Sequence, residues 1–384
     1  MYLASKEPGT SAWPGCLEMA SMFSRQLAFQ AALTVALACA SPTRAQQRIE
    51  IAGGPTCSEC RIVVEPYLTL GGDPSPGIGS PFFCMARDAL GRFWVAGTSE
   101  RDIGVYSADG KLVRTLGRLG QGPGEFRTMS HILSRGQTVS VLDPGNLRET
   151  VYDMEFNVVR TIPLPAYVNA AVTFDDSLSL YNINLWTPDK VGYTLHLVDR
   201  TGRVVLSLGY DGKVVRRDLP VGYRSLAAAS GGGFWAARTT EYELEKWTIA
   251  GERRLSIARS VPWFRAHDGT ALTPPLPWIT AIWEDSEGLL WVAIHVAAPD
   301  WERAAVMRGD LLVNVSDHNA FYDTILEVID IQRREVLAST RVDPWLRQPL
   351  GGGLIASYKE DEMGWPFVHL WRIRLDRIAP GSPR

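Results

Sequence analysis

Three histidines of this sequence could serve as metal ligands. His131, His295 and His369 fall in or beside strand-like segments that lie far apart along the chain. A catalytic zinc ion is held by about three protein ligands, commonly histidines. None of the three lies in a motif of diagnostic spacing, and neither HExxH nor the Gly-x-Ser-x-Gly elbow occurs. They are therefore zinc ligands only if the fold brings them together; otherwise each is a structural strand histidine.

The cysteines offer a second kind of chemistry. Cys57 and Cys60 form a CxxC, but no βαβ pattern surrounds it, no His follows it and no second CxxC completes a zinc site. We therefore expect a structural disulfide between Cys57 and Cys60. Cys84 lies in an apolar run, where a buried and inert thiol is the ordinary outcome.

The composition favours many short strands over long helices. The chain has 35 Gly, 24 Pro and 13 Trp, which suits turns joining strands that are packed by large aromatics. Apolar residues recur with period two along most of the chain, which indicates an all-β protein. Its 39 basic and 42 acidic residues show no basic run, so we expect no nucleic-acid partner.

Residues 1–45 have the features of an export signal. After a charged start, the apolar run Leu27–Ala40 leads to small residues ending at Ala45. The run is shorter than the ~20 residues that span a bilayer, so we expect cleavage after Ala45, a periplasmic or extracellular protein, and no transmembrane helix in the mature chain. A lipoprotein anchored at Cys39 is the alternative. Three start codons fit this leader: Met1, Met19 and Met22.

A repeated unit organises the remaining chain. Residues 82–117 contain four short strands, with turns at Asp88–Gly91 and Asp109–Gly110. Glycine suits the positive-φ position of such a turn, and the bulky residue three positions later, here Trp94, faces the neighbouring sheet. After Tyr152 we expect Asn157 to take the glycine's place. Equivalent second-strand residues are Trp94, Val139, Leu180, Trp235, Trp291 and Ile355; their spacing of 41 to 64 residues brackets the period of propeller blades.

The last unit supplies only three strands, and an unpartnered strand precedes the first unit. We expect Arg61–Leu70 to complete the last blade, with Pro66 tolerated on an edge strand. This closure removes open sheet edges. The predicted fold is all-β: a six-bladed β-propeller of four-stranded antiparallel blades, closed by an N-terminal strand, over residues 60–377. A short segment, 46–59, precedes it and a tail, 378–384, follows.

The segment Gly117–Phe126, which reads GRLGQGPGEF, resembles the connector between blades of NHL-repeat propellers, and the Asp-x-x-Gly turn followed by Trp–Val is similar to the NHL blade. The resemblance implies an exported bacterial-type propeller in which this loop is structural. A phosphate-binding loop would need a helix after it, and a strand follows. The resemblance also implies that ligands meet the face formed by the blade connectors and by the loops between second and third strands.

Arginine and aromatic side chains on that face are the types that dominate recognition hot spots. The candidates are Arg101, Arg148, Trp186, Tyr242, Trp301 and Trp365. The longest insertion contains Asp300–Gly309, for which an N-cap Asp and a terminal Gly predict a short helix.

The sequence thus predicts an exported recognition module, a monomer without a cofactor, that binds a protein, peptide or carbohydrate ligand on its loop face. Because some similar propellers are metal enzymes, the alternative is a calcium- or zinc-dependent hydrolase or lyase. Calcium would need inward oxygen ligands from several blades. The residues of the right type are Asn146, Asn169, Asn182 and Asn184.

Overall fold

The computed structural model describes residues 47–72, 75–174, 177–212, 222–269 and 273–377. The predicted leader, its cleavage site after Ala45, the alternative anchor Cys39 and the tail 378–384 lie outside these residues. No helix in the described part is long and apolar enough to cross a membrane.

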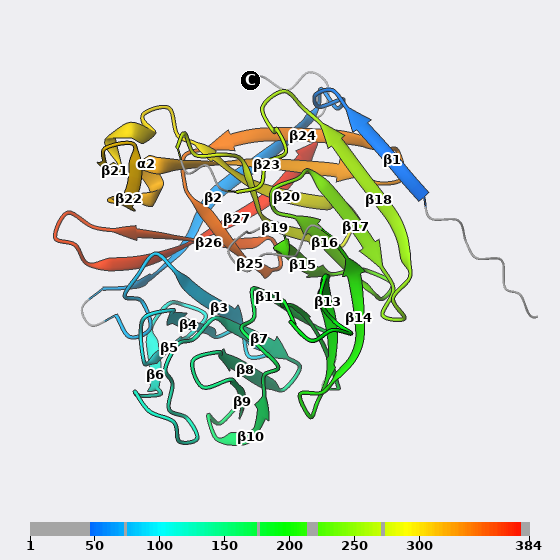
Figure 1. The fold of residues 1–384 in the computed structure, drawn as a ribbon. Coiled ribbons are helices and arrows are strands. Elements are labelled where there is room, and N and C mark those ends of the chain that lie inside the picture. The colour runs from blue at the N-terminus through cyan, green and yellow to red at the C-terminus, as the bar shows by residue number, and fades with distance from the viewer. Residues whose placement is uncertain (1–46, 73–74, 175–176, 213–221, 270–272, 378–384) are drawn as a thin grey trace, which may run out of the picture. The chain divides into compact units, whose positions relative to one another are not determined.

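The chain folds into six antiparallel blades, as predicted. The innermost strands β3, β7, β11, β15, β19 and β25 contact one another in this order, and β25 contacts β3, so the ring is closed. Figure 1 shows them gathered at the centre, with β6, β10, β14 and β18 farther out.

The strands of the first four blades follow chain order from the centre outward. Blade one comprises β3 (Phe83–Arg87), β4 (Phe93–Gly97), β5 (Ile103–Tyr106) and β6 (Leu112–Leu116); blade two, β7 (His131–Arg135), β8 (Thr138–Asp143), β9 (Arg148–Asp153) and β10 (Val158–Pro163). Blade three comprises β11 (Ala170–Thr173), β12 (Leu178–Asn182), β13 (Tyr193–Asp199) and β14 (Val204–Tyr210); blade four, β15 (Arg224–Ala228), β16 (Phe234–Arg238), β17 (Glu243–Trp247) and β18 (Arg253–Ser260).

Blades five and six differ from this arrangement, because their four strands are not consecutive in the sequence. Blade five comprises β19 (Trp278–Glu284), β20 (Leu290–Ala297), β23 (Tyr322–Asp330) and β24 (Glu335–Val342). Its insertion holds η2 (Trp301–Arg303), the hairpin of β21 (Ala305–Arg308) and β22 (Leu311–Val315), and α2 (His318–Phe321). Blade six comprises β25 (Leu346–Gly351), β26 (Leu354–Glu360), β27 (Pro366–Arg377) and, from the other end of the chain, β2 (Cys60–Gly71).

The repeated Asp, Gly and Trp of the sequence have one structural explanation. In blade one the Asp88 carboxylate accepts backbone N–H groups of the turn and the indole Nε1–H of Trp94 at 2.9 Å. Asp285 and Trp291 repeat this contact at 2.8 Å in blade five. Because the indole N–H has a partner, Trp94 can be fully buried between blades one and two. Burying its apolar surface contributes roughly 4 to 6 kcal/mol.

Closure by the N-terminal strand is confirmed. β2 pairs antiparallel with β27 as the outer strand of blade six, with Leu70 opposite Val368. The register shifts between Pro66 and Leu68, which is where an edge strand can accommodate a proline.

The residues before β2 are more integrated than the sequence indicates. β1 (Gln47–Ala52) pairs parallel with β18 and adds a fifth strand to blade four. The backbone N–H groups of Thr56 and Cys57 then donate to carbonyls of β24, and a disulfide joins Cys57 to Cys60 with an S–S distance of 1.98 Å. This segment therefore ties blades four, five and six together.

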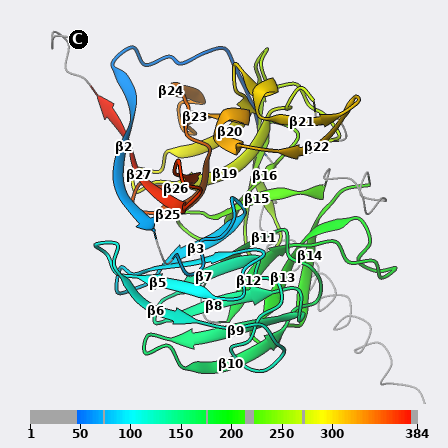
Figure 2. The same cartoon turned by 90° about the vertical axis from the view of Figure 1, so that its left-hand side faces the viewer.

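The predicted helix over Asp300–Gly309 is wrong in extent. Only η2 forms, and the chain enters β21 two residues after it. All four residues of β21, including its valine and methionine, pair with β22, so strand pairing replaces a second helical turn. In both views this hairpin lies beyond β20 and β23, away from the ring centre (Figure 1, Figure 2).

The turn after Tyr152 also differs from expectation, because Phe156 rather than Asn157 adopts the positive φ, at 70°. Asn157 instead donates its side-chain amide to Asp153 at 3.0 Å. The Phe156 ring packs against Trp94 at 5.6 Å and under the Arg92 guanidinium at 4.5 Å. These contacts offset the roughly 1–2 kcal/mol cost of a left-handed L-residue.

Candidate binding site at the axial channel

A channel of about 750 Å³ runs along the ring centre. Its walls are the innermost strands, and its lining includes residues from both ends of one strand, such as Trp278 and Glu284 of β19. Ligand sites in proteins commonly have volumes of roughly 300–1,000 Å³, so this channel is large enough for a small molecule or a side chain.

One end of the channel, here called the mouth, is formed where the blade connectors enter the innermost strands. Each blade contributes a side chain there, from the first residues of its innermost strand or from the residue just before it. The six residues, in blade order, are Phe82, His131, Asn169, Tyr223, Trp278 and Arg347. Because the ring repeats this position, residues far apart in sequence meet around one opening.

Aromatic side chains at the mouth are partly open to solvent. Phe82 is 49% exposed, Tyr223 is 36% exposed, and Tyr167, which precedes β11, is 57% exposed. Tyr223 meets Trp278 edge to face at 6.3 Å. Large aromatics that stay exposed around an opening are typical of sites that bind by apolar contact and stacking.

Arg347 lies at the same mouth, with aromatic rings packed around its guanidinium group. Its guanidinium carbon is 4.5 Å from the centre of the Trp345 ring and 5.3 Å from that of Phe82, and Nη1 donates to the Pro81 carbonyl at 2.7 Å. Burial lowers the pKa of Arg347 to about 10, which leaves the group charged at neutral pH.

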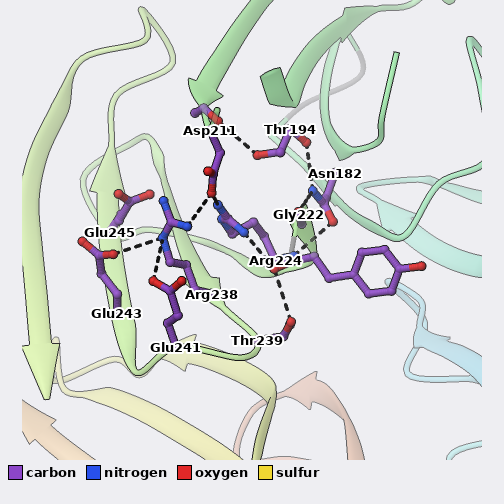
Figure 3. A network of polar contacts seen from close by, with 12 residues as sticks. Asn182, Thr194, Asp211, Gly222, Arg224, Arg238, Thr239, Glu241, Glu243 and Glu245 are labelled. Atoms are coloured by element: carbon purple, nitrogen blue, oxygen red, sulfur yellow. Dashed lines mark hydrogen bonds and ion pairs between the residues drawn. The ribbon is translucent and has the colours of Figure 1, made fainter. Parts of the chain in front are cut away.

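A polar network supports the blade-four side of the channel (Figure 3). Asp211 accepts from Arg224 at 3.3 Å and from Arg238 at 2.6 Å, and Arg238 also pairs with Glu243 at 3.0 Å. Burial and the Arg238 charge lower the pKa of Arg224 to about 10, although Glu245 and Asp211 oppose the shift. The positive charge of Arg224 is thus paired with the Asp211 carboxylate within the protein.

Asn182, at the end of β12, holds the backbone at the start of blade four. Asn182 donates to the carbonyls of Thr194 and Gly222, at 2.8 and 2.9 Å, and accepts the backbone N–H of Arg224 at 3.1 Å. Both amide hydrogens and one acceptor position of Asn182 are used in this way, so the side chain holds the backbone in place. Asn146 likewise donates to Asp143 and to the Gly120 carbonyl.

The structure does not bring His131, His295 and His369 together. His131 lines the channel, whereas His295 is enclosed by the Leu346 carbonyl at 2.7 Å and the Trp345 indole at 3.1 Å. His369 contacts Thr69 within blade six. Across the described residues no group of three or more His, Cys, Asp or Glu side chains is placed to hold a metal ion.

Burial keeps the enclosed imidazoles neutral. It lowers the pKa of His131 to about 4 and that of His295 to about 3, because a charged ring would lose its hydration there. At neutral pH these rings act as uncharged hydrogen-bonding groups.

Two of the predicted loop residues are structural. Tyr242 is buried, and its hydroxyl donates to Glu327 at 2.6 Å. Arg148 grips the Gly-rich connector, with Nη2 donating to the Gly122 carbonyl at 2.6 Å and further bonds to the carbonyls of Gln121 and Glu125. This contact agrees with a structural role for that connector.

The other predicted residues are dispersed. Arg101 lines a second cavity, of about 430 Å³, which shares Phe82, Thr98 and Tyr167 with the channel. Trp186 is partly exposed between β12 and β13, Trp301 packs on Phe321 in the blade-five insertion, and Trp365 lies in the turn before β27. Of the six, Arg101 alone lines either of these two cavities, and it lines the smaller one.

Sequence reasoning missed Tyr167, Tyr223, Trp278 and Arg347. Their shared signal is position: each lies at, just before or just after the start of an innermost strand. The residues predicted from the sequence come instead from the loops after the second strands.

Comparison with known proteins supports the fold. Residues 86–211 match a family model described as DUF5128, a 6-bladed beta-propeller. No curated protein matches the chain.

Two solved structures from Bacteroides share the fold at low identity. A member of the duf4221 family from Bacteroides vulgatus ATCC 8482 has a TM-score of 0.59 at 10% identity, covering 84% of this chain and 100% of its own. A Bacteroides fragilis NCTC 9343 protein inferred to be exported has a TM-score of 0.56 at 11% identity, with coverages of 85% and 100%. Virginiamycin B lyase from Staphylococcus aureus, at a TM-score of 0.43, 10% identity and coverages of 81% and 99%, is too distant to inform on activity.

Proposed function

We propose that this protein is an exported recognition module that binds a protein, peptide or carbohydrate ligand at the mouth of its axial channel. The observation that carries the proposal is the ring of partly exposed aromatics, Phe82, Tyr167 and Tyr223, around an opening of ligand size. Aromatic side chains contribute large contact areas at low entropic cost, which suits them to bind peptide side chains or sugar rings.

Export is supported by the leader-like residues 1–45 and by the Cys57–Cys60 disulfide, since such bonds persist in oxidising compartments. The likeness of Gly117–Phe126 to an NHL connector fits the same class of propeller. N-terminal sequencing of the chain recovered from the periplasm or medium tests this part. A start at Gln46 is expected; an acylated Cys39 would favour the lipoprotein, and an unprocessed cytoplasmic chain would contradict export.

Binding at the mouth is tested by selection from a phage-displayed peptide library and by a soluble oligosaccharide panel, both against the chain from Gln46. We expect enriched ligands to lose at least tenfold in affinity for the double variant Tyr167→Ala/Tyr223→Ala, because two stacking surfaces are removed. Tyr67→Ala is the matched control: Tyr67 is 37% exposed, but it lies on β2. Ligands that bind the double variant and the wild type equally would contradict the mouth as the site.

The alternative is a calcium- or zinc-dependent hydrolase or lyase, for which the described residues offer no group of three or more His, Cys, Asp or Glu side chains. Elemental analysis of protein purified without chelators separates the two functions. A content of about one calcium or zinc ion per chain would favour the metal-dependent enzyme over the recognition module.

A further inference from the structure

Arg347 is half-buried at the mouth, and its partners differ from those of the fully buried arginines. Arg135 pairs with Glu149 at 2.8 Å, Arg224 with Asp211 at 3.3 Å, and Arg259 with Glu327 at 2.6 Å. No described carboxylate lies within ion-pair distance of Arg347. Its one hydrogen bond within the described chain goes to a neutral carbonyl, that of Pro81.

Even partial withdrawal of a cation from water without an anion is costly, and each of these fully buried arginines has a carboxylate partner. The rings of Phe82, Phe83 and Trp345 supply partial compensation through their negative faces. They leave the remaining N–H groups of the guanidinium without acceptors in the described chain. Because Arg347 also lines the channel, an anion in the channel could accept them.

Two arginines line the channel, Arg224 and Arg347. Arg224 pairs with Asp211, so Arg347 is the one that can meet an anion there. Arg101 lines the adjoining cavity and donates to the neighbouring carbonyls of Ser99 and Glu100. His131 stays neutral at pH 7, and so does His318, whose pKa is lowered to about 4 by burial and by the Arg347 charge. Glu284, at the far end of β19, is held by Ser230, Trp235 and Lys246.

We propose that Arg347 is the anchor for a carboxylate group, and that the mouth takes ligands joining a carboxylate to an aromatic or apolar part. The guanidinium presents a planar fork that matches a carboxylate, and the exposed rings of Tyr167 and Tyr223 accept the apolar part. The inference rests on the proposed function, because it specifies which ligands bind at the mouth.

The experiment compares three probes by calorimetry at pH 7: phenylacetate, its neutral amide phenylacetamide, and phenyl phosphate. A fragment of this size is expected to bind with a Kd of about 1 mM. The charged hydrogen bond predicts that phenylacetate binds about tenfold or more tightly than the amide. Equal affinity for acid and amide, no binding of phenylacetate, or clearly tighter binding of phenyl phosphate would each overturn the carboxylate anchor.

Variants assign the effect to the residue. Arg347→Met should abolish the preference for the acid while leaving amide binding in place, whereas Arg308→Met, which removes an exposed arginine from β21, should leave the preference intact. If Arg347→Met does not fold, Arg347→Lys replaces it: a point charge should keep the preference at reduced size. An undiminished preference in Arg347→Met would overturn the proposal.

The rim variant Tyr167→Ala/Tyr223→Ala separates this inference from the proposed function. If the acid and the amide bind equally and neither binds the double variant, the mouth is a binding site but Arg347 is not its anchor. If the acid is preferred, the preference depends on Arg347 and it persists in the double variant, Arg347 is the anchor but the aromatic residues are not the site.

Discussion

Removing one partner of the buried ion pair between blades four and five should lower the stability strongly. Glu327 is 1% exposed and accepts from Arg259 Nε at 2.6 Å, from Arg259 Nη2 at 2.8 Å and from the Tyr242 hydroxyl at 2.6 Å. Arg259 also donates to the Gly53 carbonyl at 2.9 Å, which links the pair to β1. The substitution Arg259→Met keeps most of the volume and removes the charge.

The expected loss follows from the carboxylate left behind. Breaking a buried pair by removing one partner costs about 3–5 kcal/mol, because the other charge stays desolvated. For a domain of this size the loss corresponds to a fall in Tm of roughly 4 to 7 °C. Urea unfolding followed by tryptophan fluorescence, together with calorimetry, measures both quantities.

An exposed pair serves as the matched control. Arg374 and Glu65 join β27 and β2 at 2.6 Å with both side chains about half exposed, so Arg374→Met should cost far less stability than Arg259→Met. The double variant Arg259→Met/Glu327→Leu should be more stable than Arg259→Met, because it removes the stranded charge. The reasoning fails if Arg259→Met costs no more than Arg374→Met, or if the double variant loses further stability.

Two other measurements test the packing of the ring. Burial lowers the pKa of His295 to about 3 and that of His131 to about 4, so the unfolded chain binds protons first as the pH falls below about 6.5. Stability should be full above that pH and decline as the pH falls towards 4, by at most about 1.4 kcal/mol per pH unit and histidine; thermal unfolding between pH 5 and 8 that shows no decline would refute the neutral, buried state. Gly104→Ala in β5 should cost about 1–3 kcal/mol, because its Cβ would lie 2.1 Å from the Pro76 carbonyl oxygen. Gly54→Ala, with nothing within 4 Å of its Cβ, should be close to neutral, and equal Tm values for the two variants would contradict this.

The architecture could be predicted from the sequence because it depends on local rules repeated along the chain. An aspartate and a glycine make a turn, and a tryptophan six residues after the aspartate returns a hydrogen bond to it, as Asp88 and Trp94 do. Such units need only short-range information, and their period gives the blade count. The closing strand was predictable as well, because β25, β26 and β27 leave blade six one strand short.

Which residues form the candidate binding site could be seen only in the tertiary structure. Phe82, Tyr223 and Arg347 share no motif, and they meet only because ring closure brings the starts of six strands to one opening. The same closure buries Tyr242 against Glu327, which no pattern around Tyr242 indicates. Composition and period determined the blades. The partners of each side chain, and hence the channel-lining arginine for which the described chain supplies no carboxylate, followed from packing between blades.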